Sequence, residues 1–216
     1  MVWPDVLLRV IGRFISLEGG EGAGKSTQVR ALAMALEARG IVVVITREPG
    51  GSDGAEAIRA LLMQGDVARW SPQAETLLFA AARADHVERT IRPALDAGRW
   101  VLTDRYVDST RAYQGIGGVD DDAILALHRF GSGGLMPDRT FLLGLPVEQG
   151  VARATARDGA AADRFAARGE GFHLAVAQGF ERIARDDRDR VRLIDASRPA
   201  AHVTADIMAG LADLLP

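Results

Sequence analysis

The chain has 216 residues, a length that suits one domain with a substantial core. Its formal net charge of −3 argues against a broad basic surface for nucleic acid, and the absence of cysteine excludes disulfides and thiolate chemistry and fits a reducing cytosol. No apolar run reaches the length of a membrane span, and the start lacks a signal-peptide pattern. The four histidines are too far apart along the chain to favour a zinc cluster.

The sequence GGEGAGKST, residues 19–27, comes between a short apolar strand at 13–18 and a helix at 25–39. It matches G-x-x-x-x-G-K-[ST], the loop whose backbone N–H groups surround phosphate groups at the positive end of a helix. Lys25 can reach the terminal phosphates, and the Ser26 hydroxyl can ligate the magnesium that accompanies a nucleotide. The alternative is a plain glycine-rich turn, but motif and context together favour a nucleoside triphosphate site. Its contacts are Gly19, Gly20, Glu21, Gly22, Ala23, Gly24, Lys25, Ser26 and Thr27.

Strands and helices alternate along the rest of the chain, which predicts parallel βαβ units. Further strands are expected at 41–46, 99–104, 140–145 and 191–194. Further helices are expected at 54–64, 72–97 with an interruption at Pro93, 120–130, 147–156, 172–185 and 202–215. The predicted fold is therefore α/β, a P-loop NTPase three-layer α/β/α sandwich with a central parallel sheet. We expect a short N-terminal extension at 1–12 and one domain at 13–216.

Charged side chains follow the predicted strands where ligands bind in open α/β sheets. Arg47 and Glu48 follow the strand at 41–46, and Asp104 ends the strand at 99–104. Asp104 opens a polar stretch, DRYVDSTRAYQGIGG, and residues 157–164, RDGAAADR, have the composition of a mobile loop. Arg47 and Glu48 therefore lie at the edge of the sheet where a ligand is expected.

Four stretches resemble the bacterial thymidylate kinases in order and spacing: GGEGAGKST at 19–27, TREPGG at 46–51, LFAAAR at 78–83 and DRYVDSTRAYQG at 104–115. The resemblance runs from about residue 13 to 215, and the second and fourth stretches carry most of its specificity. It implies a homodimeric cytoplasmic enzyme. That enzyme moves the γ-phosphoryl group of ATP to dTMP, with Mg²⁺, giving dTDP and ADP for dTTP synthesis.

The resemblance assigns Arg47, Arg59 and Arg105 to the acceptor phosphate. A phosphate monoester close to the ATP γ-phosphate concentrates negative charge, which fixed cations with forked donors make tolerable. Asp104 fits a role in holding magnesium or positioning water, and Glu48 is expected to orient Arg105 by a salt bridge. The competing interpretations are a surface charge for Arg59 and a helix cap for Asp104.

For the base, the resemblance points to Phe79 as a stacking face and to Arg83 as a donor to a pyrimidine carbonyl. Thr110 and Gln114 are expected to bond the remaining polar edge. Tyr113 is expected to lie against the sugar, where its ring leaves little room for a 2′-hydroxyl. The competing interpretation of Phe79 is core packing, because it lies on an apolar helix.

The phosphate loop carries no arginine, so the cation that stabilises γ-phosphoryl transfer is expected to come from elsewhere. We expect residues 157–165 to form a lid that delivers Arg164, in an Asp-Arg-Phe context that matches the family, with Arg157 as the weaker candidate. An exposed loop whose arginines only aid solubility is the alternative. Ala166 and Gly144 depart from the family pattern, outside the acceptor site.

Two rival functions remain open at this stage. One is a kinase for another nucleoside monophosphate, such as UMP or dCMP, which the set Arg83, Thr110 and Gln114 argues against. The other is a nucleotide-dependent switch or partitioning ATPase that binds a protein partner. The number of arginines on the acceptor side disfavours a switch.

Overall fold

The computed structural model describes residues 12–158, 164–165 and 168–216. The predicted N-terminal extension at 1–12 lies outside the described residues except for Gly12, and so does most of the predicted lid. None of the described helices is both long and apolar enough to cross a membrane.

Five parallel strands form the central sheet, in the order β2-β3-β1-β4-β5. They are β1 (Phe14–Glu18), β2 (Val43–Arg47), β3 (Trp100–Asp104), β4 (Arg139–Gly144) and β5 (Val191–Asp195). β1, β3 and β4 consist mostly of buried residues, as expected for parallel strands covered on both faces. The chain order reverses at β1, whose neighbours are β3 and β4, so the segments after β1 and β3 lie side by side.

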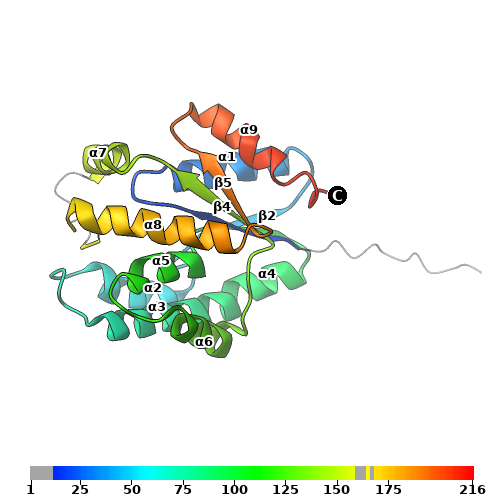
Figure 1. Ribbon diagram of the computed structural model, residues 1–216. Coiled ribbons are helices and arrows are strands. Elements are labelled where there is room, and N and C mark those ends of the chain that lie inside the picture. The colour runs from blue at the N-terminus through cyan, green and yellow to red at the C-terminus, as the bar shows by residue number, and fades with distance from the viewer. Residues whose placement is uncertain (1–11, 159–163, 166–167) are drawn as a thin grey trace, which may run out of the picture.

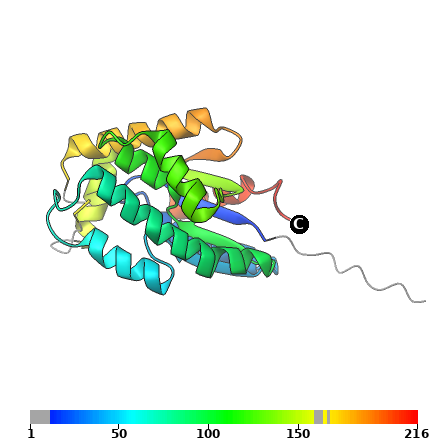
Figure 2. The ribbon, with the colours of Figure 1, turned by 90° about the horizontal axis from the view of Figure 1, so that it is seen from below.

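Helices cover both faces of this sheet, which confirms the predicted three-layer fold (Figure 1). One face carries α1 (Lys25–Glu37) and α9 (Ala200–Ala209); the other carries α4 (Arg92–Asp96) and α8 (Glu170–Asp186). Outside α8 and α4 lie α2 (Asp53–Met63), α3 (Pro72–His86), α5 (Val107–Gly115) and α6 (Asp121–Ser132), as the view from below shows (Figure 2). Helix α7 is Val147–Asp158.

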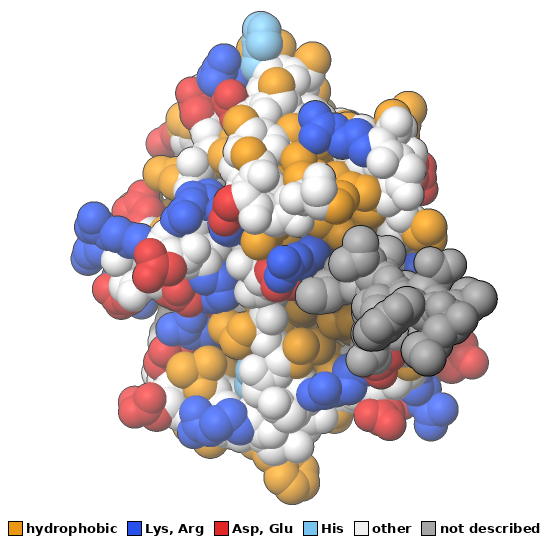
Figure 3. Space-filling view, turned by 90° about the vertical axis from the view of Figure 1, so that its right-hand side faces the viewer, with side chains coloured by type: hydrophobic (Ala, Val, Ile, Leu, Met, Phe, Trp, Pro, Cys, Tyr) orange, Lys and Arg blue, Asp and Glu red, His pale blue; other side chains and the backbone are white. Residues whose placement is uncertain are grey.

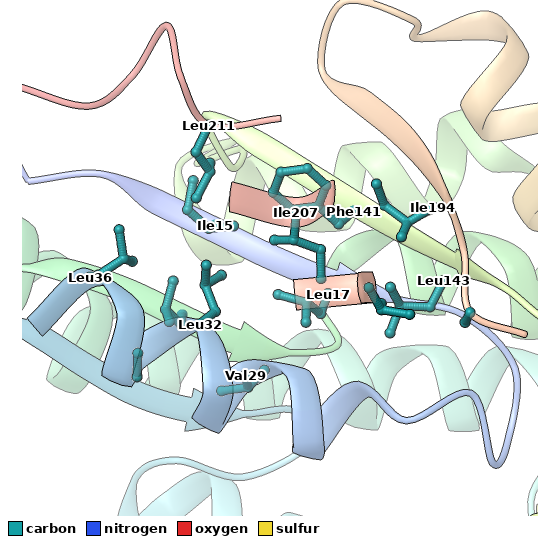
Figure 4. Close-up of a cluster of buried hydrophobic side chains, with 14 of the residues drawn as sticks. Ile15, Leu17, Val29, Leu32, Leu36, Phe141, Leu143, Ile194, Ile207 and Leu211 are labelled. Atoms are coloured by element: carbon teal, nitrogen blue, oxygen red, sulfur yellow. The ribbon is translucent and has the colours of Figure 1, made fainter. Parts of the chain in front are cut away.

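The largest apolar cluster fills the space between the sheet and the pair α1 and α9 (Figure 4). Leu32 and Leu36 point from α1 toward Ile15 and Leu17 on β1, and Ile207 comes down from α9. These side chains are fully buried, and each contributes about 1.5–3 kcal/mol through removal from water. This packing fixes the start of α1, and therefore the phosphate loop, against the end of β1.

Three elements differ from the sequence-based expectation. The stretch predicted only as polar contains α5, whose buried face is largely hydrogen-bonded rather than apolar. The helix expected over 72–97 consists of two α-helices, α3 and α4, joined by a π-helix, η1 (Val87–Ile91). The irregularity therefore precedes Pro93. A proline has no N–H for the preceding turn, and the wider π turn accommodates that loss. Helix α9 ends at Ala209 and is followed by turns.

The end of the molecule where the C-terminus lies carries charges of both signs (Figure 3). Basic and acidic side chains alternate across this face, with hydrophobic side chains between them. This mixture fits the small net charge of the sequence.

Candidate active site

A cavity of about 470 Å³ opens at the carboxyl ends of β1, β2 and β3. Pairing of Leu17 with Asp104 across β1 and β3 places the phosphate loop beside the Asp104–Arg105 corner. Many of the predicted site residues line this one cavity: Glu21, Gly22, Gly24, Lys25, Ser26, Thr27, Arg47, Glu48, Arg59, Phe79, Arg83, Asp104, Arg105, Thr110, Tyr113 and Gln114. Its volume is in the range of small-molecule sites.

The phosphate loop takes the backbone shape that its glycines permit. Gly24 is the N-cap of α1 with φ of 90°, and Gly22 has φ of 67°, both in the left-handed region that other residues rarely adopt. A Cβ on Gly22 would also collide with the backbone of Gly150 on α7. The Lys25 ammonium donates to the carbonyl oxygens of Gly19 at 3.1 Å and Gly20 at 2.8 Å. Burial lowers the pKa of Lys25 to about 8, which disfavours its charged form. An anion bound beside it would raise this pKa and favour the ammonium.

Ser26 and Asp104 meet at the edge of the loop, where the Ser26 hydroxyl donates to Asp104 Oδ2. A hydroxyl and a carboxylate are hard oxygen donors, the type that Mg²⁺ prefers, and two protein ligands suffice when phosphates and waters supply the rest. The pair therefore fits the predicted magnesium role. Among the described residues there is no cluster of three or more His, Cys, Asp or Glu side chains that could form an all-protein metal cage.

Arg105 is held between the phosphate loop and α5. Its backbone adopts φ of 72°, and its guanidinium donates to the Gly19 carbonyl at 3.0 Å, to Ser109 Oγ at 3.1 Å and to Glu21 Oε1 at 2.7 Å. The Tyr113 hydroxyl donates to the same Glu21 oxygen at 3.2 Å, and Arg105 lies 5.0 Å from the Tyr113 ring centroid. The Glu21 carboxylate of the phosphate loop thus orients both Arg105 and Tyr113.

The predicted salt bridge between Glu48 and Arg105 does not form, because each side chain has another partner. Glu48 accepts from Arg83 Nε at 2.7 Å and contacts His86 Nδ1 at 3.0 Å, and His86 Nε2 lies 2.6 Å from Thr46 Oγ1. Burial acts to raise the pKa of Glu48, but Arg83 and His86 outweigh it and hold the pKa below its usual value. The buried carboxylate therefore fixes Arg83 instead.

Three predicted base-reading side chains, Arg83, Thr110 and Gln114, come together on one wall of the cavity. Arg83 donates to Thr110 Oγ1 at 2.7 Å, and Gln114 donates to Glu75 Oε1 at 2.8 Å. Phe79 lines the cavity with its ring centroid 5.9 Å from that of Phe165.

Two further arginines border the cavity. Arg47 donates to Glu56 at 2.9 Å and is more than half exposed, whereas Arg59 donates to the Pro49 carbonyl at 2.7 Å. Arg47 ends β2, and Arg59 comes from α2, so separate elements bring them to the side on which Arg105 lies. The structure thus gathers the three predicted acceptor-phosphate cations around one cavity.

The structure does not bring Arg164 to the phosphate loop. Its side chain is buried against α2 and α3, donates to the Leu62 and Val67 carbonyl oxygens, and pairs with Glu75. Every guanidinium nitrogen is engaged there, so this conformation gives Arg164 a different task from the one predicted. Arg157 lies in α7 rather than in a loop, and its side chain is outside the described part of the chain, as are residues 159–163 of the predicted lid.

Sequence reasoning missed several residues of the wall: Arg30, Pro49, Met63, Tyr106, Ser109 and Phe165. Arg30 lies one helical turn beyond Ser26, a spacing that could have placed it beside the loop. Glu75 carried no visible signal, because a single carboxylate on an apolar helix usually faces solvent.

A thymidylate kinase family model matches residues 17–207. The thymidylate kinase of Rhizorhabdus wittichii is 59% identical over 206 residues, covering 95% of this chain and 99% of that protein. That of Caulobacter vibrioides is 55% identical over 197 residues, covering 91% and 94%. The crystal structure of thymidylate kinase from Ehrlichia chaffeensis superposes with a TM-score of 0.74 at 31% identity, covering 93% of this chain and 99% of that one.

Proposed function

The chain belongs to the thymidylate kinase family, and we propose that it transfers the γ-phosphoryl group of ATP to dTMP, giving dTDP and ADP. The observation that supports this most strongly is one cavity lined by the phosphate loop, by Arg47, Arg59 and Arg105, and by the polar side chains of Arg83, Thr110 and Gln114. ATP would lie on the loop, and dTMP would enter between α2, α3 and α5. The two phosphate groups would then meet near Arg105.

Positioning and charge stabilisation would supply most of the catalysis. The dTMP phosphate is already a nucleophile at neutral pH, so no general base is required. Arg47, Arg59 and Arg105 would hold the acceptor phosphate. Lys25 would compensate charge between the β- and γ-phosphates of ATP. To do so, its ammonium would leave the Gly20 carbonyl oxygen, to which it donates at 2.8 Å.

Mg²⁺ would be held by Ser26 and Asp104 together with phosphate oxygens. When bound, it neutralises phosphate charge and orients the phosphoryl group for in-line transfer. Of the two arginines predicted to reach the γ-phosphate, we favour Arg157, since Arg164 is engaged at Glu75 in this conformation.

The sugar would lie against Tyr113. The ring is packed edge-on against Phe165, Phe172 and Phe180, and its hydroxyl is fixed by Glu21. A ring held from both ends cannot move aside for a 2′-hydroxyl, which supports a preference for a deoxynucleotide.

We also propose that residues 13–216 act as one kinase domain, in the cytoplasm, as a homodimer. The cysteine-free composition fits a reducing compartment. For the dimer, Phe130 on α6 is 92% exposed and Leu77 on the contacting helix α3 is 55% exposed, so two neighbouring helices offer apolar surface to a second copy.

Product analysis tests the proposal directly. The purified chain, ATP and Mg²⁺ should give dTDP and ADP in equal amounts when dTMP is present. Without dTMP, ATP hydrolysis should be slow by comparison. A protein-dependent switch would instead hydrolyse ATP without forming dTDP, and that outcome would reject the kinase.

A further inference from the structure

Glu75 on α3 lies buried between two other side chains that come from different elements. Its Oε1 accepts from the Gln114 amide at 2.8 Å, and its Oε2 pairs with the guanidinium of Arg164. Arg168 lies 3.6 Å from the same Oε2. The Glu75 side chain is 5% exposed, so neither partner can be replaced easily by water.

The carboxylate fixes which way the Gln114 amide faces. A carboxylate can only accept hydrogen bonds, so the NH₂ group of Gln114 must face Glu75 and the oxygen must turn away from it. Gln114 lines the cavity, and within the described part of the chain its buried Oε1 has no hydrogen-bond donor. A buried acceptor without a partner calls for a donor from a ligand.

The pyrimidine bases differ in what they offer such an acceptor. Ring atom N3 of thymine or uracil carries a hydrogen and donates, whereas N3 of cytosine carries a lone pair and accepts. An amide oxygen beside N3 therefore bonds thymine and uracil and repels cytosine, while an amide NH₂ at the same place has the reverse preference. Base discrimination then depends on the direction of the Gln114 amide.

We propose that Glu75 is a positioning residue that sets this direction, and that Arg164 holds Glu75 in place to do so. The inference rests on the proposed function, because it assumes a pyrimidine nucleotide in this cavity. Arg164 is anchored to the Leu62 and Val67 carbonyl oxygens as well. The next residue, Phe165, lines the cavity and packs against Phe79, so the same short segment touches the base-reading wall twice.

The test is the ratio of kcat/KM for dTMP to kcat/KM for dCMP, measured for the full chain and for Glu75→Gln. In this variant Arg164 still requires an acceptor, so the oxygen of the new amide would face Arg164 and its NH₂ would face Gln114. The Gln114 amide would then turn its own NH₂ toward the base. We expect the dTMP-to-dCMP ratio to fall at least about tenfold, and the dUMP-to-dCMP ratio to fall with it, since uracil shares N3–H.

Two controls separate positioning from general damage. Glu75→Asp keeps a carboxylate and should keep the ratio even if activity drops. Asp108→Asn alters another buried carboxylate paired with arginines, Arg190 and Arg111, and should lower stability without changing the ratio. A folded Glu75→Gln variant with an unchanged ratio would overturn the inference.

Arg164→Ala provides a second test that does not depend on Glu75→Gln folding. Release of Glu75 should raise the KM for dTMP severalfold and lower the dTMP-to-dCMP ratio, with kcat within about threefold of wild type. A collapse of kcat with unchanged KM and ratio would instead place Arg164 at the γ-phosphate and contradict the inference. If the wild-type chain itself does not phosphorylate dTMP, the proposed function fails, whatever the variants do.

Discussion

Lys25 is the residue on which the proposed transfer would depend most directly. It is 7% exposed, and burial lowers its pKa to about 8, so the ammonium sits in a site that disfavours charge until an anion binds. Lys25→Met keeps the length of the stem and removes the charge. Turnover should fall by on the order of 10²-fold or more, because a fixed charge at the phosphates is lost.

The measurement is steady-state turnover of ATP and dTMP together with thermal unfolding. The variant should unfold at or above the wild-type temperature, since the desolvation penalty of a buried ammonium disappears. A folded variant with near wild-type turnover would remove Lys25 from the mechanism.

For single residues, the sequence predicted which side chains line the cavity more reliably than it predicted their hydrogen-bond and ion-pair partners. Arg105 and Glu48 were expected to form a salt bridge, and β2 and β3 do place Arg47 beside Asp104. Side-chain direction decided otherwise: Glu48 turns toward Arg83 and His86 on α3, and Arg105 turns toward Glu21. Nothing in the spacing of these residues encodes which rotamer each adopts.

Among the elements, those with apolar periodicity were predicted and α5 was not. Its buried residues include Asp108, Thr110 and Gln114, which hydrogen bonds and ion pairs satisfy instead of apolar contacts. A helix that serves as the wall of a polar site has a weak hydrophobic pattern, because its inner face is the site. The central strands β1, β3 and β4, in contrast, are buried by ordinary packing, which composition reveals.

The junction between β1 and α5 should make stability depend on pH. Glu18, the last residue of β1, is fully buried, and burial together with nearby Asp108 raises its pKa from 4.5 to about 8. It accepts from the backbone N–H of Tyr106 at 2.7 Å. Between those two pKa values the folded state holds a proton that the unfolded state releases. The free energy of unfolding should therefore fall as pH rises from about 4.5 to 8, by up to about 1.4 kcal/mol per pH unit.

Chemical denaturation from about pH 5 to 8 checks this for the ligand-free protein. Glu18→Gln cannot titrate, so its stability should fall less steeply than that of the wild type over this range. Glu148→Gln, at an exposed position on α7, is the matched control and should follow the wild type. Lys25 changes the pH dependence of stability only above about pH 8. Between about pH 8 and pH 10.5 its lowered pKa makes the free energy of unfolding rise with pH. Parallel profiles for Glu18→Gln and wild type would show that Glu18 does not hold the proton.

At the scale of the whole molecule, the proposed dimer predicts a mass of twice 23.1 kDa in solution. Phe130→Asp puts a charge on the exposed apolar surface proposed for α3 and α6 and should shift the protein to the monomer. Met34→Asp, at a 71% exposed position on α1 across the sheet, should leave the dimer intact (Figure 1). Sedimentation velocity distinguishes these results. A wild-type monomer at micromolar concentration, or a Phe130→Asp dimer, would contradict the assignment of this surface.

The measurement that tests the central claim most directly is kcat/KM for ATP-dependent phosphorylation of dTMP, dUMP, dCMP and UMP by the wild-type chain. We expect dTMP to be used best and dUMP about 10- to 200-fold less well, because it lacks only a methyl group. A buried polar partner left unpaired costs about 10⁴-fold or more in such sites, so dCMP should be far poorer. UMP should be poorer than dUMP because the proposed position of the sugar against Tyr113 would leave little room for a 2′-hydroxyl. Equal use of dTMP and dCMP, or ATP turnover that does not respond to dTMP, would contradict the account.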